Sequence, residues 1–153
     1  MERIKSFSVD HNKLEKGIYI SRKDGDVITY DMRFCKPNCG VYLDNITMHT
    51  VEHMMATFLR NSQYSDDVVY FGPMGCQTGF YLLMRDKVST KDALALVKDC
   101  LKRTVEHDGA VFGASAVECG NYRTLELGKA KRACEEYLAV LADVDDICDY
   151  EAV

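Results

Sequence analysis

The sequence predicts an α+β fold in which an antiparallel β-sheet packs against helices within a single domain. The first reason is length, because 153 residues suit one domain with a sizeable core. The second is composition, since 47% of the residues are hydrophobic and they form both short strand-like runs and longer helical patterns. The third is order. The expected elements run strand, strand, helix, strand, strand, helix, helix, which is typical of helices covering an antiparallel sheet.

Four strands are expected from short runs rich in β-branched and aromatic residues. In chain order, these runs are Gly17–Arg22, Val27–Phe34, Val68–Phe71 and Phe80–Met84. A turn with the sequence Lys-Asp-Gly-Asp joins the first two, and the glycine-rich stretch Gly72–Gly79 joins the last two. We therefore expect the two strands of each pair to be antiparallel.

Three helices are expected, and each begins at a residue whose side chain can cap free backbone N–H groups. The first runs from Asp44 or Asn45 to about Ser62, the second from Ser89 to near Gly109, and the third from Asn121 to about Leu141. Asp92 follows Ser89 by three residues, which is the spacing of a capping pair.

The formal net charge of −5 argues against a nucleic-acid-binding protein that works through phosphate contacts. Residues 143–153 hold five acidic and no basic residues, so acids and bases balance in the rest of the chain. We therefore expect a domain at residues 1–142, followed at residues 143–153 by an acidic tail that is a solvated end.

The N-terminal residues contain no apolar signal-peptide core. No stretch approaches the roughly 20 apolar residues that a membrane span needs. These features predict a soluble, cytoplasmic protein with no membrane partner. The chain has seven cysteines, and in a reducing compartment such thiols serve as metal ligands, catalysts or core residues.

The first expected helix has one apolar face and one face that carries two histidines. At about 100° per residue, one arc holds the side chains that should pack on the sheet: Val51, Met54, Met55, Phe58 and Leu59. His49 and His53 lie on the other side, four residues apart, so both imidazoles can bind one metal ion. Glu52 flanks this pair, where it can contact a metal-bound water or a substrate. Because the histidines face away from the core, we expect a second copy of the chain to cover them at a homodimer interface.

The residue that completes a metal site has three candidates. Cys35 and Cys39 would give a structural zinc site with the two histidines. Glu118 or Glu126 would suit a peptidase with the inverted zinc motif, which takes a downstream carboxylate. Cys119, just before a glycine and between two helices, would give two imidazoles and one thiolate with one open position, as in catalytic sites.

Cys76 lies in the glycine-rich turn between the last two expected strands. Backbone N–H groups exposed in such a turn can stabilise a thiolate, which makes Cys76 a candidate catalytic group. The alternative is an ordinary hairpin turn in which cysteine serves as a small apolar residue. Three other cysteines fit that second description or lie in the tail: Cys100, Cys134 and Cys148.

Five separated motifs together resemble the S-ribosylhomocysteine lyase (LuxS) family, and they run in order through most of the chain. The motifs are Ser6-Phe7-x-x-Asp10-His11, Asp31-Met-Arg33-Phe-Cys35, His49-Thr-x-Glu52-His53, Gly72-Pro-Met-Gly-Cys76-Gln-Thr-Gly79 and Glu118-Cys119-Gly. Five motifs in register are far more specific than any one of them. One departure stands before the fourth motif, where the family often has Asp-Ile-Ser and this chain has Tyr70-Phe71-Gly72.

The resemblance implies a homodimeric enzyme with two active sites at the subunit interface. Members of the family cleave S-ribosylhomocysteine to homocysteine and 4,5-dihydroxy-2,3-pentanedione, the precursor of autoinducer-2 in quorum sensing, and so also recycle by-products of methyl donors. The ribose carbonyl migrates by proton transfers until β-elimination can release the sulfur. The family's metal is Fe2+, replaceable by Zn2+ or Co2+, with one per subunit, and it acts as a Lewis acid without a change of valence.

The same resemblance implies roles for individual residues. The metal ligands would be His49, His53 and Cys119, while Cys76 and Glu52 would be the acid–base pair. Four residues would belong to the substrate site: Ser6, His11, Arg33 and Asp31. Because an N-terminal segment is often frayed, the first two of these can act only if that segment is pinned, for example on the partner subunit.

Overall fold

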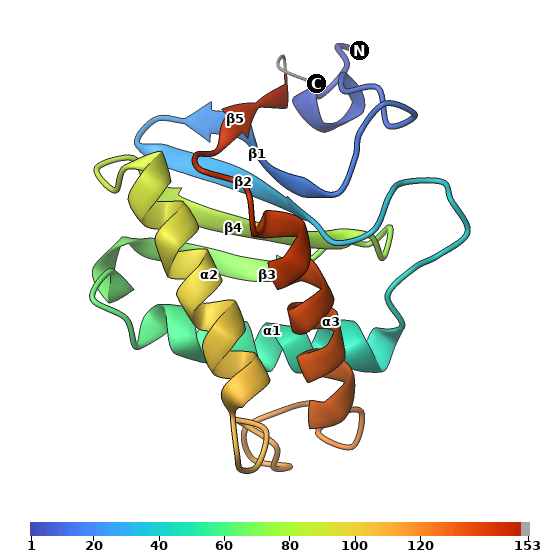
Figure 1. The fold of residues 1–153 in the computed structure, drawn as a ribbon, viewed down its shortest axis with the longest axis vertical. Helices are drawn as coiled ribbons and strands as arrows, with labels where there is room; N and C mark the ends of the chain where they lie inside the picture. Colours follow the sequence, from blue (N-terminus) through green and yellow to red (C-terminus); the bar gives the residue numbers. More distant parts are fainter. Residues whose placement is uncertain (151–153) are drawn as a thin grey trace.

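The computed structural model describes residues 1–150 as one α+β domain, in which a five-stranded sheet carries three helices on one face (Figure 1). The strands are β1 (Gly17–Asp24), β2 (Val27–Arg33), β3 (Val68–Pro73), β4 (Gly79–Arg85) and β5 (Cys148–Asp149). The helices are α1 (Asn45–Arg60), α2 (Thr90–Glu106) and α3 (Leu127–Leu141). The predicted α+β class is therefore confirmed. The last three residues of the expected acidic tail, 151–153, lie outside the described residues.

The sheet has the strand order β3-β4-β2-β1-β5. All three pairings among β1 to β4 are antiparallel, as predicted. The fifth strand is parallel to β1, so the sheet is mixed rather than purely antiparallel. This strand comes from the acidic tail, where no strand was expected.

The tail joins the sheet because it contains an apolar anchor. Ile147 is buried in the core, and Cys148 and Asp149 then pair with Tyr19 and Ile20 of β1. Lys98 of α2 donates a hydrogen bond to the carbonyl of Val144 at 2.8 Å. The expectation of a fully solvated tail is therefore wrong at Ile147 and at the β5 pairing, since burial of one isoleucine and an open sheet edge outweigh the acidic composition.

Alternation along β2 separates a core face from a polar face. Tyr30 and Met32 point into the core beneath the helices, whereas Asp31 and Arg33 point to the opposite side of the sheet. On α1, the predicted apolar arc is confirmed, because all five of its residues are buried in the core. The fold therefore leaves two polar surfaces, one on α1 and one on the far face of the sheet.

Two of the three predicted helix starts are confirmed. The Asp44 side chain accepts a hydrogen bond from the backbone N–H of Thr47 at 2.7 Å, and Ser89 accepts one from Asp92 at 3.1 Å. The third prediction is wrong, because α3 begins at Leu127 rather than after Asn121. The intervening residues form turns that contact α1, so they are used for a tertiary contact instead of a helical one.

Within residues 1–150, no helix combines the length and the apolar character that crossing a bilayer requires.

Candidate active site

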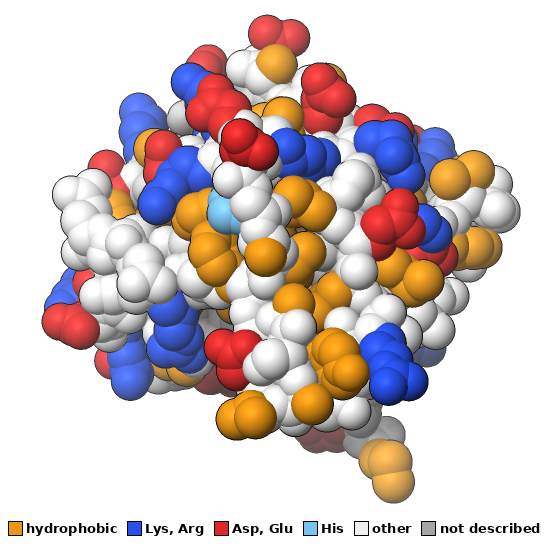
Figure 2. All heavy atoms as spheres, turned by 90° about the horizontal axis from the view of Figure 1, so that it is seen from below, with side chains coloured by type: hydrophobic (Ala, Val, Ile, Leu, Met, Phe, Trp, Pro, Cys, Tyr) orange, Lys and Arg blue, Asp and Glu red, His pale blue; other side chains and the backbone are white. Residues whose placement is uncertain are grey.

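His49 and His53 stand one turn apart on α1, and both rings are partly buried. Their ring centroids lie 4.6 Å apart with an interplanar angle of 87°. The Asp44 cap and the buried arc determine which way these rings point, since the arc holds the opposite side of the helix in the core. Figure 2, which views the molecule from below Figure 1, shows hydrophobic side chains gathered around an exposed histidine.

Each histidine is oriented by the loop that joins α2 to α3. The Nδ1 atom of His49 lies 3.1 Å from the carbonyl oxygen of Thr124 and 2.9 Å from its hydroxyl oxygen. The Nδ1 atom of His53 lies 2.7 Å from the carbonyl oxygen of Phe112. A carbonyl oxygen can only accept, so both Nδ1 atoms carry the proton and both Nε2 atoms keep a free lone pair.

Cys119 completes a group of three metal-binding side chains. Its Sγ lies 3.4 Å from Nε2 of His49, and the donor atoms of His49, His53 and Cys119 all lie within 4.8 Å of one another. The backbone N–H of Asn121 donates a hydrogen bond to this sulfur at 3.4 Å. Two neutral imidazoles and one thiolate suit a zinc or ferrous ion and leave a fourth position open.

This grouping decides among the three candidates for the third ligand. Among the described residues, only Cys119 joins the two histidines in a group that could hold a metal. Cys35 is instead buried in the core, and the backbone N–H of Glu126 donates to the hydroxyl of Thr50 at 2.9 Å. Neither a structural Cys2His2 site nor an inverted zinc motif with a downstream carboxylate is therefore assembled by the described residues.

The loop can approach α1 closely because it contains a glycine. Gly113 has a φ of +67°, and a Cβ atom there would lie 3.2 Å from Nδ1 of His53. Both the backbone conformation and the lack of space favour glycine. Glu52 lies between the two histidines in sequence and is partly buried, but it does not belong to the group of donor atoms. Its position agrees with the expectation that it contacts something other than the metal.

A second cluster lies on the face of the sheet opposite the helices. Arg33 and Asp31 form an ion pair whose side chains are 2% and 0% exposed. The Arg33 Nε donates to Asp31 Oδ1 at 3.1 Å, and Nη2 donates to Oδ2. Burial by itself lowers the pKa of Arg33, but the charge and hydrogen bond of Asp31 outweigh this, so the pKa lies above its usual value. Arg33 is therefore a buried cation rather than a solvated charge at a strand end.

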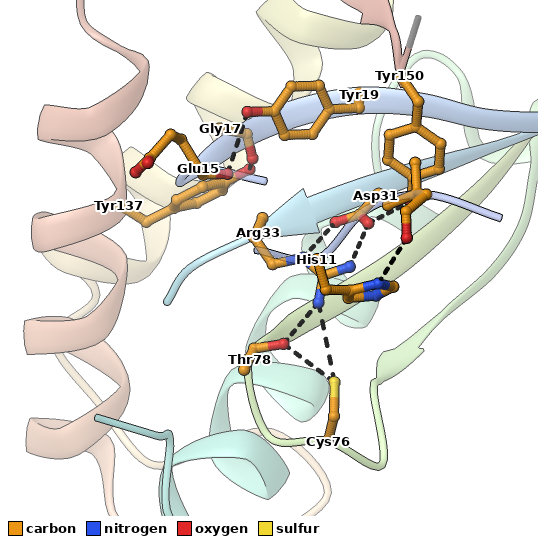
Figure 3. Close-up of polar contacts among 11 residues, drawn as sticks. His11, Glu15, Gly17, Tyr19, Asp31, Arg33, Cys76, Thr78, Tyr137 and Tyr150 are labelled. Atoms are coloured by element: carbon orange, nitrogen blue, oxygen red, sulfur yellow. Dashed lines mark hydrogen bonds and ion pairs between the residues drawn. The ribbon is translucent and has the colours of Figure 1, made fainter. Parts of the chain in front are cut away.

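Arg33 connects this ion pair to the turn that carries Cys76 (Figure 3). Its Nη1 donates to the Thr78 hydroxyl at 2.6 Å and lies 3.8 Å from the Cys76 sulfur. The sulfur in turn lies 3.0 Å from the Thr78 hydroxyl oxygen. Because Cys76 is exposed while Arg33 is buried beneath it, the thiol has solvent on one side and a fixed cation on the other.

The Cys76 turn also lies against the start of α1. The backbone N–H of Leu43 donates to the carbonyl of Gln77 at 2.9 Å, and the Gln77 amide donates to the Asn45 side chain at 3.2 Å. His49 is one helical turn beyond Asn45, which is about 6 Å along the axis. The thiol and the histidine pair are thus placed by neighbouring segments, although Cys76 does not belong to the metal-binding group.

The N-terminal segment covers part of the polar sheet face. Ser6 is hydrogen-bonded to the phenol of Tyr81, and Tyr81 is the cross-strand neighbour of Asp31. Burial and then the Asp31 charge raise the pKa of Tyr81. His11 appears in the same close-up as Arg33, with its Nδ1 3.0 Å from the carbonyl oxygen of Val9 (Figure 3). Ser6 therefore lies next to this cluster within the same chain.

Sequence reasoning missed four residues that contact the predicted ones: Thr78, Tyr81, Thr124 and Tyr150. Alternation along β4 could have placed Tyr81 on the polar face, but only the strand register pairs it with Asp31. At the departure before Cys76, the Tyr70 side chain lies over Gly72, and a Cβ there would lie 2.0 Å from the Tyr70 hydroxyl oxygen. The Tyr70 ring occupies the space that a side chain at residue 72 would need.

Comparisons with known proteins agree with this arrangement. The family model described as S-Ribosylhomocysteinase (LuxS) matches residues 4–147. A protein of Desulfotalea psychrophila named S-ribosylhomocysteine lyase is 45% identical over 148 residues, which cover 94% of this chain and 93% of that protein. A Clostridium beijerinckii protein of the same name is 43% identical over 143 residues, covering 90% of each chain. A Borreliella burgdorferi protein of that name is 42% identical over 151 residues, covering 95% of this chain and 96% of that protein.

Proposed function

The chain belongs to the LuxS family of S-ribosylhomocysteine lyases, and we propose that it cleaves S-ribosylhomocysteine with the help of a metal ion held by His49, His53 and Cys119. The observation that carries this proposal is the convergence of the three donor atoms within 4.8 Å of one another. The products would be homocysteine and 4,5-dihydroxy-2,3-pentanedione, the autoinducer-2 precursor.

The donor set fits a divalent ion such as Fe2+, with Zn2+ or Co2+ as replacements. Both imidazoles offer Nε2 because their Nδ1 atoms donate to the loop, and the thiolate adds one negative charge. When bound, such an ion would supply Lewis-acid stabilisation of negative charge on a substrate oxygen. This set of ligands has no redox role in the proposed reaction.

Cys76 is the proposed group that removes and returns carbon-bound protons. Proton transfer from carbon needs a base close to the reacting atom, and the exposed sulfur meets that need. The Arg33 Nη1 atom lies 3.8 Å from the sulfur, so a positive charge stands next to the proposed base. The Thr78 hydroxyl can follow either protonation state, because it can donate to a thiolate or accept from a thiol.

Glu52 is the proposed group that handles protons on substrate oxygens. It lies on α1 between the two histidines in sequence and is not one of the three grouped donors, which supports a role beside the metal rather than as a ligand. Proton transfers by Cys76 and Glu52 would move the ribose carbonyl along the sugar chain. Once the carbonyl is at C3 of the sugar, the proton on C4 becomes acidic. Loss of that proton and departure of the homocysteine thiolate from C5 complete the β-elimination.

We further propose that the active form is a homodimer with its sites at the subunit interface. Large apolar side chains next to the candidate site residues are exposed to solvent, which is typical of a surface that binds another protein. Phe7, which follows Ser6, is 69% exposed, and Val117, two residues before Cys119, is 97% exposed. We expect Val117→Asp to convert the dimer to a monomer and to lower activity, as measured by sedimentation and thiol release. A fully active monomer would remove the dimer proposal.

Release of free thiol from S-ribosylhomocysteine, followed with a thiol reagent on anaerobically prepared protein, tests the reaction. Cys76→Ala and Glu52→Gln should each keep the fold and the metal while lowering turnover by at least about 100-fold. A peptidase would instead lose its metal in Glu126→Gln and keep it in Cys119→Ser. A structural zinc module would unfold in Cys35→Ser and be indifferent to Glu52→Gln. Either of these last patterns contradicts the proposal.

A further inference from the structure

Tyr150 has no role in the family motifs, yet it contacts the ion pair on the polar face of the sheet. Its phenol donates a hydrogen bond to Oδ2 of Asp31, the same oxygen that accepts from Nη2 of Arg33 (Figure 3). The other oxygen, Oδ1, accepts from Arg33 Nε at 3.1 Å. Because the Asp31 side chain is fully buried, Tyr150 supplies the donor that solvent would otherwise provide.

The C-terminal strand delivers this phenol with a defined geometry. Ile147 is buried in the core, and β5 then adds to the open edge of β1. The ring of Tyr150 packs on the ring of Tyr19, with centroids 5.8 Å apart. Tyr19 is itself the cross-strand neighbour of Asp31, so strand register brings the tail residue over the carboxylate. Burial and then the charge of Asp31 raise the pKa of Tyr150, which keeps the phenol protonated as a donor.

These contacts continue to the candidate catalytic thiol. Asp31 holds Nε and Nη2 of Arg33, which leaves Nη1 to contact Thr78 and the Cys76 sulfur. The direction of a planar guanidinium is set by the carboxylate that binds its other two nitrogens. Anything that rotates or solvates the Asp31 carboxylate therefore displaces the positive charge next to the sulfur.

We propose that Tyr150 is a positioning residue, through which the C-terminal strand orients the Asp31–Arg33 pair and so holds a positive charge beside the Cys76 sulfur. This role rests on the proposed function of Cys76 and adds to it a contact outside the five motifs. The C-terminal residues then help to orient active-site side chains and are not only a solvated end.

The test compares two hydroxyl deletions on the same pair of packed rings. Tyr150→Phe removes the donor to Asp31 and keeps the ring that packs on Tyr19. Tyr19→Phe is the matched control, because the Tyr19 hydroxyl donates to the carbonyl of Glu15 at 3.0 Å and not to Asp31. We expect Tyr150→Phe to lower kcat about tenfold with less than about a threefold change in KM, since outer partners of a reacting group are typically worth 10- to 100-fold. Tyr19→Phe should keep kcat near that of the unaltered protein.

A second measurement does not depend on lyase activity. Iodoacetamide modification of Cys76, followed by peptide mass mapping so that the other exposed thiols are resolved, should slow about threefold or more in Tyr150→Phe and stay unchanged in Tyr19→Phe. Unchanged kcat and unchanged Cys76 modification in a folded Tyr150→Phe protein would overturn the inference. Equal losses of kcat and of Cys76 modification rate in Tyr150→Phe and Tyr19→Phe would also overturn the inference, because they would indicate that Tyr150 only packs against its neighbour. Failure of the proposed function is distinct, since it would appear as thiol release that survives Cys76→Ala.

Discussion

The metal-binding group and the Arg33–Asp31 cluster differ in how the protein holds them. The three metal-binding side chains are partly exposed and come from one helix and one loop, with a single loop residue orienting each histidine. The Arg33–Asp31 pair is buried, comes from adjacent positions on one face of a strand, and has partners from two further segments, the Cys76 turn and the C-terminal end of the described chain. Hydrogen bonds between one loop and one helix therefore hold the first group, whereas the second is preorganised by the sheet.

This difference matches what each group is proposed to do. A metal site needs an open position for the substrate, so its ligands remain partly accessible. A cation that tunes a thiol needs low exposure, because solvent screens its charge. We expect the two groups to respond oppositely to substitution: the buried pair should govern stability, and the metal-binding group should govern metal affinity.

The largest expected effect on stability is at Asp31. Asp31→Ala leaves the Arg33 cation buried without its partner, which should lower the free energy of unfolding by about 3–5 kcal/mol, as measured by urea denaturation of metal-free protein. Asp24→Ala is the control, since the Arg22–Asp24 pair on β1 is exposed and should contribute less than about 1 kcal/mol. Similar small losses in both variants would mean that the Arg33–Asp31 pair is not the preorganised element.

Cys119→Ser should separate the two groups most clearly. Replacing the thiolate with a weakly binding hydroxyl should weaken Zn2+ binding by at least about 100-fold, because even outer partners of metal ligands are worth 10- to 100-fold. The urea midpoint of the metal-free protein should change little, since the loop is partly exposed. Competition with a chelator measures the affinity. Cys39→Ser, at an exposed cysteine, should leave the Zn2+ affinity unaltered. Equal losses of affinity in the two variants would contradict the proposal that Cys119 is a metal ligand.

Thr124→Val tests the support of the metal-binding group. It removes the hydroxyl that lies 2.9 Å from Nδ1 of His49 but keeps the backbone carbonyl, so metal affinity should fall by about tenfold. Thr124→Ser retains a hydroxyl and should restore most of the affinity in the same chelator competition. An unchanged affinity in Thr124→Val would show that the carbonyl alone orients the imidazole.

The smallest expected effect is a pH dependence at the start of α1. The hydrogen bond from Lys129, then that from the Thr47 N–H, lower the pKa of Asp44 from 3.8 to about 2. A lowered pKa in the folded protein stabilises it above pH 4, and this contribution is lost as the pH falls toward 2. Because Asp44 is largely exposed, Asp44→Ala should cost only about 1 kcal/mol at neutral pH, and the difference should narrow near pH 2 in urea titrations. Asp44→Asn retains the cap and should lower the free energy of unfolding by less than Asp44→Ala does. A difference between Asp44→Ala and the unaltered protein that did not change with pH would contradict the role of the Asp44 charge.

Much of the fold could be predicted because its signals are local. Short runs rich in β-branched and aromatic residues predicted four strands, and caps at Asp44 and Ser89 predicted two helix starts. The Asn121 cap failed because the following residues contact α1, a competition that no local pattern reports. Residues 144–149 were predicted as solvated from their acidic composition, but a single buried isoleucine and the free edge of β1 decided otherwise.

The candidate site was predictable to a similar degree. Four-residue spacing was enough to pair His49 with His53, since a helix places such residues on one side. Residue spacing alone left the third ligand as one of three alternatives, because the path of a loop of about twenty residues cannot be derived from its sequence. The resemblance to the LuxS family is what implied Cys119. Thr78, Tyr81 and Tyr150 were missed because their contacts depend on strand register and on β5.

By itself, the sequence determined the helical pairing of two imidazoles, the buried arc beneath them and the four strands of the two hairpins, because each of these depends on neighbours a few residues apart. Only the tertiary structure shows that Cys119 lies within reach of both imidazoles, that Arg33 is a buried cation beside Cys76, and that a tyrosine from the acidic tail hydrogen-bonds to its carboxylate partner. Those contacts join residues 43 to 119 positions apart, and they form only when burial of the core brings the sheet, the loop and the C-terminal strand together.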